Sequence, residues 1–392
     1  MKKLFSLVFG IIFVAAAAVG LLSAARFFEN PTRCFDETPC EALADAGSPY
    51  KAYFFTLTNI EKHAYNAILA ELPTMPERIK IPNLDGFELE NVFSALLNDN
   101  PELFFLGRTC TLEEFTFRYD YFVPEYTLTA SEYSDHLTGL IAKSKKILST
   151  VTDINDPWLT ELEIHDYIIR NCEYKLNDDG SDFLVSTAYG ALMNGLAACE
   201  GYSKGTKLLL DMAGVQCAVV SGDATNSDGK TVKHMWNAVC LNEKWYYLDC
   251  TWDDPVSEKA GNIPNYSYFN LTTDMISSTH GSFSYDFDCT SIEENYHVKN
   301  GTYFTEYSRS SEKKVTDIII DSVEKGDGRI ELRFADKKSY DSAMDDLFDE
   351  GSRRIDYVLT SVSMRTSKKF SDRFRYIPDS KQYVLTLVID LV

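Results

Sequence analysis

The sequence is short of basic residues for its acidity. Its 392 residues include 38 Lys and Arg against 59 Asp and Glu, which gives a formal net charge of −21. A surface this acidic repels phosphate backbones and anionic lipid headgroups. The balance therefore argues against nucleic acid as a partner and predicts a solvated, acidic surface.

Cysteine pairs of the kind that bind zinc are absent. The nine cysteines include no CxxC pair, so a zinc ribbon is not indicated and no metal site is expected. Cys34 and Cys40 lie close together in the sequence and are the best local candidates for a disulfide. The odd total fits at least one free thiol.

Beyond its N-terminus the sequence has no long apolar run. Two lysines precede an apolar stretch from Leu4 to Ala25, which Arg26 ends. The small residues Ser23–Ala25 are similar to a signal-peptidase site, but the stretch is also near the ~20 residues that span a bilayer. A cleaved signal peptide and an uncleaved signal anchor both remain open. Because lysines before such a stretch stay in the cytoplasm, we expect an extracytoplasmic protein, secreted or anchored at the cell surface by residues 1–25.

Composition and periodicity divide the chain behind this leader into four segments. Residues 26–50 have the composition of a linker, and residues 51–152 predict an N-terminal α+β region. Residues 153–312 form a central domain, and residues 313–392 predict a small C-terminal α/β domain.

Local signals support several elements within these segments. Thr58, with Glu61 three residues later, has the form of a capping box and predicts a helix start. In the C-terminal segment, Ser339–Asp349 predicts a helix, whereas Ile318–Val323 and Asp356–Ser363 predict strands.

Cys199 stands where a turn gives way to a predicted helix. Residues Cys199–Met212 have helical periodicity, and the preceding Asn194-Gly195-Leu196 predicts a turn. A free thiol has a pKa near 8.5, and a helix N-terminus lowers it, because the helix dipole and the free N–H groups favour an anion. Gly201 allows the backbone and a substrate to approach closely. Cys199 is therefore a candidate nucleophile whose own N–H could stabilise an oxyanion.

A predicted hairpin supplies a base and a group to orient it. Residues 234–241 and 244–251 predict two strands around a two-residue turn. With that turn, Asp249 faces Trp236, and alternation puts Trp236 and His234 on one face. Asp249 is then a diagonal neighbour of His234, within side-chain reach. Cys199, His234 and Asp249 thus form a geometrically sensible catalytic triad.

Three sequence blocks occur in this order with informative spacing. They are Ala197–Ser203 (AACEGYS), His234–Asn237 (HMWN) and Trp245–Asp253 (WYYLDCTWD), preceded by His165–Tyr167 and Tyr189–Leu192. Together they resemble the transglutaminase-like superfamily in its bacterial, exported form. The resemblance covers roughly residues 155–256, about a quarter of the chain.

The resemblance implies a papain-like α+β core with a helix-borne Cys199 and an antiparallel sheet that carries His234 and Asp249. It implies an enzyme that acts on an amide bond through a thioester, with no cofactor. The superfamily contains proteases, amidases, protein cross-linkers and members without catalysis, so resemblance alone does not choose the reaction. We expect hydrolysis of a peptide, protein or cell-wall amide, because nothing in the sequence shows how water would be excluded from the thioester.

Two other interpretations remain open. Gly201–Gly205 matches GxSxG, the nucleophile elbow of serine hydrolases, with Ser203 as nucleophile. That motif requires a buried strand before it, whereas Leu192–Ala198 contains Asn and Gly and no β-branched residue. Alternatively, the chain is a non-catalytic binding or scaffolding module at the cell surface that keeps the fold.

Several neighbouring residues are weaker candidates for contact with substrate or the oxyanion. Trp236 and Trp252 could wall a cleft or pack in the core, and Asn237 and Tyr189 could position the histidine or bind substrate. Tyr202 completes this group.

Overall fold

The structure is a computed structural model that describes residues 50–115, 119–176, 182–226, 228–255, 263–349, 351 and 353–391. The predicted leader, the linker up to residue 49, and the Cys34–Cys40 pair lie outside these residues. The chain forms two compact units. The first runs to Ser221 and includes His234–Cys240, and the second comprises Gly222–Lys233 and Leu241–Val392.

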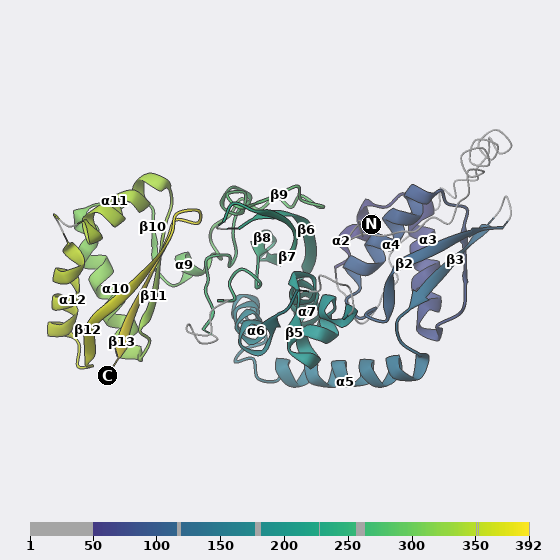
Figure 1. Cartoon of the computed structure of the whole chain (residues 1–392), viewed down its shortest axis with the longest axis horizontal. Helices are drawn as coiled ribbons and strands as arrows, with labels where there is room; N and C mark the ends of the chain where they lie inside the picture. The colour runs from purple at the N-terminus through teal and green to yellow at the C-terminus, as the bar shows by residue number, and fades with distance from the viewer. Residues whose placement is uncertain are drawn as a thin grey trace, which may run out of the picture. The chain divides into compact units, whose positions relative to one another are not determined.

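The N-terminal region packs short helices on a three-stranded antiparallel sheet of order β1-β3-β2 (Figure 1). Its helices are α2 (Ala52–Thr56), α3 (Asn59–Glu71), the 3-10 turn η1 (Leu72–Thr74), α4 (Gly86–Asp99) and α5 (Ala130–Leu148). Its strands are β1 (Ile79–Pro82), β2 (Leu106–Glu114) and β3 (Tyr119–Tyr126). The predicted capping box is confirmed, because Thr58 and Glu61 exchange side-chain-to-backbone hydrogen bonds at the start of α3.

The segment that leads to Cys199 is short and closely packed. It contains α6 (Pro157–Asn171), β4 (Glu173–Tyr174), the 3-10 turn η2 (Phe183–Ser186), the π-helical turn η3 (Gly190–Asn194), β5 (Leu196–Ala197) and α7 (Cys199–Met212). Gly195 has φ +65, which confirms the predicted turn. The two-residue strand β5 pairs in parallel with β4 and delivers the chain to α7.

The predicted hairpin belongs to a four-stranded sheet of order β8-β7-β6-β9. Its strands are β6 (Cys217–Thr225), β7 (Thr231–Leu241), β8 (Lys244–Leu248) and β9 (His280–Gly281). The predicted two-residue turn is confirmed, since Asn242 and Glu243 both have positive φ, as a tight hairpin turn requires. β8 ends three residues before the predicted boundary, because the Asp249 carboxylate accepts hydrogen bonds from the N–H groups of Thr251 and Trp252 and bends the chain.

The C-terminal domain is a four-stranded sheet of order β10-β11-β13-β12 with helices on one face (Figure 1). Its strands are β10 (Tyr303–Phe304), β11 (Arg329–Phe334), β12 (Phe370–Asp379) and β13 (Val384–Leu391). Its helices are α10 (Glu312–Lys325), α11 (Lys337–Phe348) and α12 (Arg354–Arg365), and the short elements α8 (Thr273–Ile276), α9 (Tyr296–Lys299) and η4 (Arg309–Ser311) precede them.

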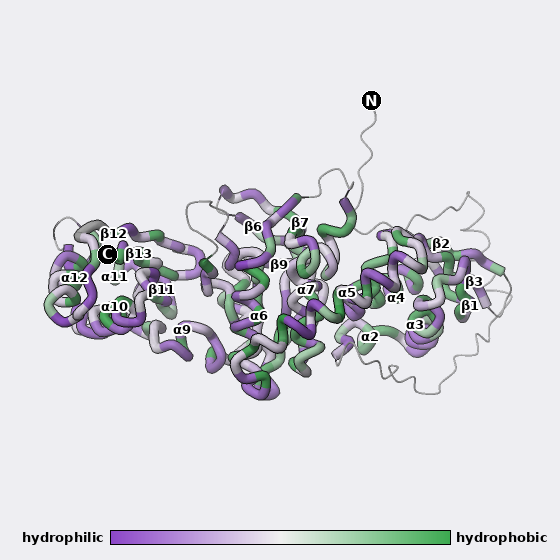
Figure 2. Tube along the Cα trace, turned by 90° about the horizontal axis from the view of Figure 1, so that it is seen from below, coloured by the Kyte–Doolittle hydropathy of each residue, from purple (hydrophilic) through white to green (hydrophobic). Residues whose placement is uncertain are grey.

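Two strand predictions in this domain are wrong. Ile318–Val323 lies in α10, and Asp356–Ser363 lies in α12. The physical reason is that the apolar residues of both segments recur at helical spacing. Val315, Ile319 and Val323 are buried along one side of α10. Hydrophobic and hydrophilic residues accordingly alternate along α10 and α12 in Figure 2.

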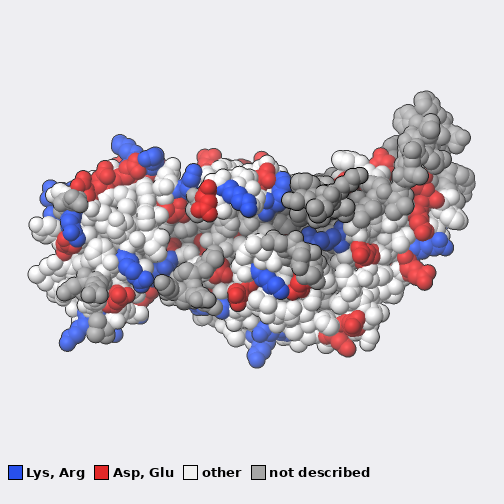
Figure 3. Space-filling view, viewed as in Figure 1, with Lys and Arg blue, Asp and Glu red and all other residues white. Residues whose placement is uncertain are grey.

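No helix within the described ranges is long and apolar enough to cross a membrane. On the face shown in Figure 3, Lys and Arg side chains are interspersed with Asp and Glu. The acidic excess is therefore not gathered into a single patch on that face.

Candidate active site

Cys199 is the first residue of α7 and is partly exposed. Its N-cap is Ala198, which has extended backbone angles but no side-chain oxygen, and no side chain caps this helix end. The first N–H groups of a helix have no partner within the helix. A helix end without a side-chain cap can favour an anion, and Cys199 stands at this end of α7.

The backbone around Cys199 is fixed by a close approach at Gly201. A Cβ atom at this position would lie 2.4 Å from the carbonyl oxygen of Val185 and 2.8 Å from Cβ of Ala197. The N–H of Ala198 donates to the same Val185 carbonyl at 2.8 Å. Only glycine therefore fits here without a shift, and the loop at η2 holds the start of α7 in place.

Asn237 connects the strand of His234 to the helix of Cys199. Asn237 is buried on β7, and its Nδ2 donates to the carbonyl oxygens of Ser203 in α7 at 3.0 Å and Ala218 in β6 at 3.3 Å. His234 lies three residues before Asn237 on β7 and is 5% exposed. The rings of His234 and Trp236 are roughly parallel, with centroids 6.0 Å apart, and Trp236 is fully buried. One buried amide thus fixes β7 against α7.

Ser203 does not occupy a nucleophile elbow. It lies in the second turn of α7, is 2% exposed, and its Oγ donates to the carbonyl oxygen of Cys199 at 2.9 Å. An elbow serine stands instead on an exposed strand-to-helix turn. In this chain that turn is occupied by Cys199.

Asp249 follows β8, the strand next to β7 in the sheet, and is 1% exposed. Its Oδ1 accepts from the backbone N–H groups of Thr251 at 2.9 Å and Trp252 at 3.1 Å. Its Oδ2 accepts from Nε2 of His280 at 3.1 Å. Sequence reasoning missed His280, because it lies outside the three sequence blocks and carries no motif of its own.

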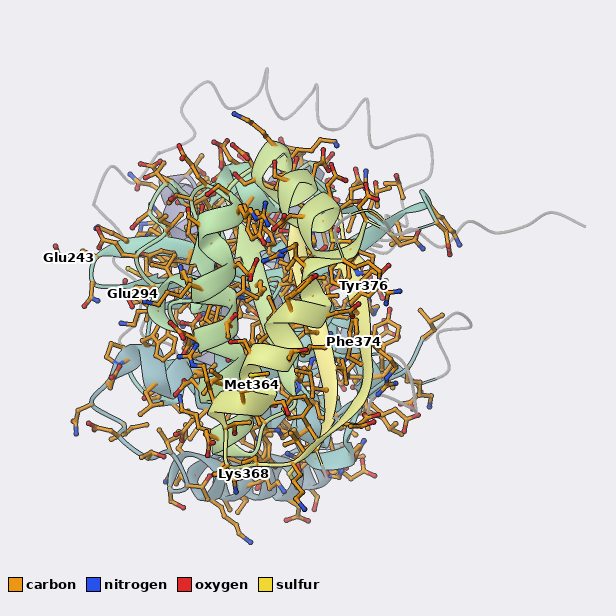
Figure 4. The ribbon with its side chains drawn as sticks, turned by 90° about the vertical axis from the view of Figure 1, so that its left-hand side faces the viewer. Glu243, Glu294, Met364, Lys368, Phe374 and Tyr376 are labelled. Atoms are coloured by element: carbon orange, nitrogen blue, oxygen red, sulfur yellow. The ribbon has the colours of Figure 1, made fainter. Side chains whose placement is uncertain are left out.

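Two glutamates outside the hairpin contact its turn and hold it in place. Asn242 donates through Nδ2 to Oε1 of Glu294 at 2.9 Å, and Lys244 forms an ion pair with Glu293 at 2.7 Å. Figure 4 shows Glu243 and Glu294 on the same side of this part of the chain. These contacts fix the strand ends from which the predicted register is counted.

The comparison with family models finds a match in this region. The model of the transglutaminase-like superfamily matches residues 146–250, a range that includes Cys199, His234 and Asp249. Residues 146–250 are therefore similar to transglutaminase-like domains. The predicted α+β class with a transglutaminase-like, papain-like core is confirmed.

Individual relatives of this domain are distant. Human kyphoscoliosis peptidase is 32% identical over 82 residues, which are 18% of this chain and 12% of that protein. A solved transglutaminase is 18% identical over 46% of this chain and 52% of its own, with a TM-score of 0.26. A candidate cysteine protease from Cytophaga hutchinsonii is 13% identical over 37% and 55%, with a TM-score of 0.24. This chain thus spans only part of each.

Two of the weaker candidates within the matched range, Tyr202 and Tyr189, make contacts typical of packed side chains. Tyr202 is fully buried, and its hydroxyl donates to the carbonyl oxygen of Cys172 at 3.0 Å. Tyr189 is half-buried, with its ring 5.2 Å from that of Phe104 and 4.8 Å from that of His136. Both rings therefore have packing roles in the first unit.

Just outside the matched range, Trp252 lies beside the Asp249–His280 pair. Its ring centroid is 4.7 Å from that of His280 and 5.2 Å from that of Tyr268. Trp252 therefore forms one aromatic wall around the histidine.

Basic side chains outnumber acidic ones in the ion-pair cluster of Glu200, the residue after Cys199. Glu200 forms ion pairs with Lys204 and with Arg108 of β2. Burial opposes its ionisation, but the two cations outweigh burial and lower the pKa of Glu200. Two cations face one carboxylate here, although the chain as a whole is strongly acidic.

Cys110 and Cys217 are poorer candidates for a nucleophile than Cys199. Burial raises the pKa of the Cys110 thiol to about 12 and also raises the pKa of Cys217. No cysteine within the described ranges is in a disulfide, and Cys240 shares the partial exposure of Cys199.

Proposed function

We propose that the protein is an exported cysteine hydrolase or acyltransferase that acts on amide bonds through Cys199, His234 and Asp249. The observation that carries this proposal is the position of Cys199 at the uncapped N-terminus of α7, partly exposed. It is also supported by the hydrogen bond from Asn237 to Ser203, by the neighbouring strands β7 and β8, and by the family match over all three residues.

In this mechanism the Cys199 thiolate attacks the amide carbonyl carbon. The oxyanion that forms is stabilised by the N–H of Cys199. The imidazolium of His234 gives its proton to the leaving nitrogen, the C–N bond breaks, and a thioester remains. Asp249 orients His234 and stabilises its charged form. Water or an amine acceptor, deprotonated by His234, then attacks the thioester. The C–S bond breaks, a carboxylic acid or a new amide is released, and the Cys199 thiolate and the His234 imidazolium are restored.

The proposed substrate is a peptide, protein or cell-wall amide outside the cytoplasmic membrane. Support for export comes from the apolar stretch Leu4–Ala25 behind two lysines, either as a signal peptide or as the membrane anchor. The flanking domains would present the substrate or hold the enzyme at the cell surface. The net charge of −21 disfavours nucleic acid as a partner.

The first prediction concerns Cys199→Ala. This variant is expected to lose amide turnover, measured with a library of fluorogenic peptide amides, by about 10³-fold or more, because the covalent step has no other nucleophile. Its melting temperature should stay close to that of the wild type. Cys240→Ala is the matched control, since Cys240 is also partly exposed, and it should keep its activity.

The outcome also separates the alternatives. Substantial turnover by Cys199→Ala, together with fluorophosphonate labelling of Ser203, would favour the serine hydrolase. A wild-type protein that turns over no amide, and whose Cys199 reacts with iodoacetamide no faster than an ordinary thiol, would favour the non-catalytic binding module.

A further inference from the structure

His280 is a buried histidine with a defined partner on each ring nitrogen. Its Nε2 lies 3.1 Å from Oδ2 of Asp249, and its Nδ1 lies 2.9 Å from Oγ1 of Thr279. The side chains of His280 and Asp249 are 0% and 1% exposed. β9 holds His280 in the sheet, where it pairs with Ala224 of β6. The pair is therefore a fixed feature of the second unit.

The chemistry of the partners assigns the protons. An ionised carboxylate only accepts hydrogen bonds, so Nε2 of His280 carries the hydrogen that faces Asp249. Oγ1 of Thr279 lies within hydrogen-bond distance of Nδ1 and also donates to the carbonyl oxygen of Ile276 at 3.3 Å. The Nε2–H donor orients the carboxylate. With Oδ1 bound to the N–H groups of Thr251 and Trp252, both oxygens of Asp249 are fixed.

A chain of hydrogen bonds connects this pair to the C-terminal sheet. Gln382, 1% exposed, donates through Nε2 to Oγ of Ser278 at 2.8 Å and to Oγ1 of Thr279 at 3.5 Å. Its Oε1 accepts from Arg333 of β11 at 2.8 Å. Since Arg is a donor only, the amide oxygen of Gln382 must face Arg333 and its NH₂ group must face Thr279. The orientation of the Gln382 amide is therefore fixed.

We propose that His280 is a positioning residue that holds the Asp249 carboxylate in the orientation required by His234. Arg333, Gln382 and Thr279 hold His280 in turn, so hydrogen bonds connect the C-terminal domain to Asp249. This inference rests on the proposed function, in which Asp249 orients His234. It gives the C-terminal domain a part in catalysis through defined bonds, since groups that orient a functional residue contribute to activity without touching substrate.

The test compares two substitutions of His280. His280→Phe keeps an aromatic ring beside Trp252 but removes both nitrogens. His280→Gln can offer an amide N–H near the position of Nε2. We expect His280→Phe to lower kcat on fluorogenic peptide amides by about 10- to 100-fold with little change in KM, the range seen when an orienting partner is lost. His280→Gln should recover most of that loss.

A second measurement needs no substrate. The rate of iodoacetamide alkylation at Cys199, resolved by mass spectrometry at a fixed pH, reports the reactivity of this thiol. In His280→Phe this rate should fall, and His280→Gln should restore it. Thr279→Val, which removes only the hydroxyl, should lower kcat by about 3- to 10-fold and keeps the test available if His280→Phe does not fold.

Failure of this inference is distinct from failure of the proposed function. Wild-type kcat and alkylation in His280→Phe and Thr279→Val, with Cys199→Ala inactive, would overturn the role of His280 and leave the triad intact. Equal losses in His280→Phe and His280→Gln would also overturn it, because the N–H would then be irrelevant. Full activity in Cys199→Ala would instead remove the proposed function itself.

Discussion

The buried amide of Asn237 is the residue-scale contact that places the His234 strand on the Cys199 helix. Asn237→Ala removes the donor to the carbonyl oxygens of Ser203 and Ala218 and leaves them buried. We expect a loss of about 1–3 kcal/mol in the free energy of unfolding, the cost of buried groups without their partner. Turnover should fall as well, because β7 is no longer fixed to α7. Urea unfolding and peptide-amide kinetics measure both effects.

Asn300→Ala is a matched control for this substitution. Asn300 also donates through Nδ2 to a backbone carbonyl, that of Tyr296 at 2.9 Å, but it is exposed. Its loss should change stability by no more than about 0.5 kcal/mol, as for most surface substitutions. If the two variants lose the same stability, the buried hydrogen bonds of Asn237 contribute little to the free energy of unfolding.

At this scale the sequence predicts residues that belong to a motif and misses those that do not. The position of Cys199 follows from a turn residue with positive φ and a helical apolar pattern, both of which are local. His280 follows from neither, because its partner Asp249 is distant in sequence and becomes a neighbour only when β9 joins the sheet. For Asn237, position on the strand was predictable, but its bond to Ser203 depends on how the strand packs on α7.

At the scale of elements, the missing cap of α7 has a testable consequence. Ala198 has the extended angles of an N-cap residue, φ −82 and ψ 175, and is half-buried. Ala198→Ser should stabilise α7 by about 0.5–2 kcal/mol, because its oxygen accepts from an N–H group of the first turn. The same bond withdraws that N–H from the thiolate. We therefore expect turnover, and the rate of iodoacetamide alkylation of Cys199 at a fixed pH, to fall by about 2- to 5-fold.

Ala198→Gly isolates the effect of the added oxygen. Glycine at this position also lacks an acceptor, so the alkylation rate of Cys199 in this variant should match that of the wild type. A serine variant that is more stable and equally active would mean that the helix terminus does not activate Cys199.

Elements were predictable where a local signal marks them and not where long-range packing decides. The hairpin turn was predictable because two residues between two alternating runs require a tight turn. The segments around Ile319 and Val358 were wrongly expected to be strands, since β-branched residues favour strands in isolation. In the fold, their apolar residues are spaced as on one side of a helix and pack into the C-terminal core. This burial outweighs the intrinsic preference of β-branched residues for strands.

At the scale of the whole molecule, a buried charge cluster joins the N-terminal region to α7. Lys207 of α7 donates to the carbonyl oxygen of Cys217 at 2.6 Å and forms an ion pair with Asp211 at 2.9 Å. It also donates to the carbonyl oxygen of Tyr50 at 3.1 Å. Asp99, at the end of α4, accepts from the N–H of Phe54 at 2.8 Å. Such a cluster links the elements of the first unit. Leaving one of its buried charges without a partner would lower the stability of the fold.

The last prediction follows from the titration of Asp99. Burial, opposed by Lys207, raises the pKa of Asp99 to about 6. An aspartate in the unfolded chain has a pKa near 3.9, so the folded state binds the proton more tightly. The stability contributed by this proton is complete below about pH 4 and is lost as pH rises through 6. Between pH 5 and 7.5 this site should lower the free energy of unfolding by a few kcal/mol at most, because a tenfold difference in proton affinity corresponds to about 1.4 kcal/mol.

Asp99→Asn separates this site from all others that titrate. The amide keeps the shape of the carboxylate and does not ionise, so the variant should lose less stability than the wild type between pH 5 and 7.5. The measured quantity is the difference between the two urea-unfolding curves at each pH. Asp135→Asn, on the exposed side of α5, controls for the loss of one negative charge. Parallel pH profiles for wild type and Asp99→Asn would show that Asp99 ionises alike in the folded and unfolded chain.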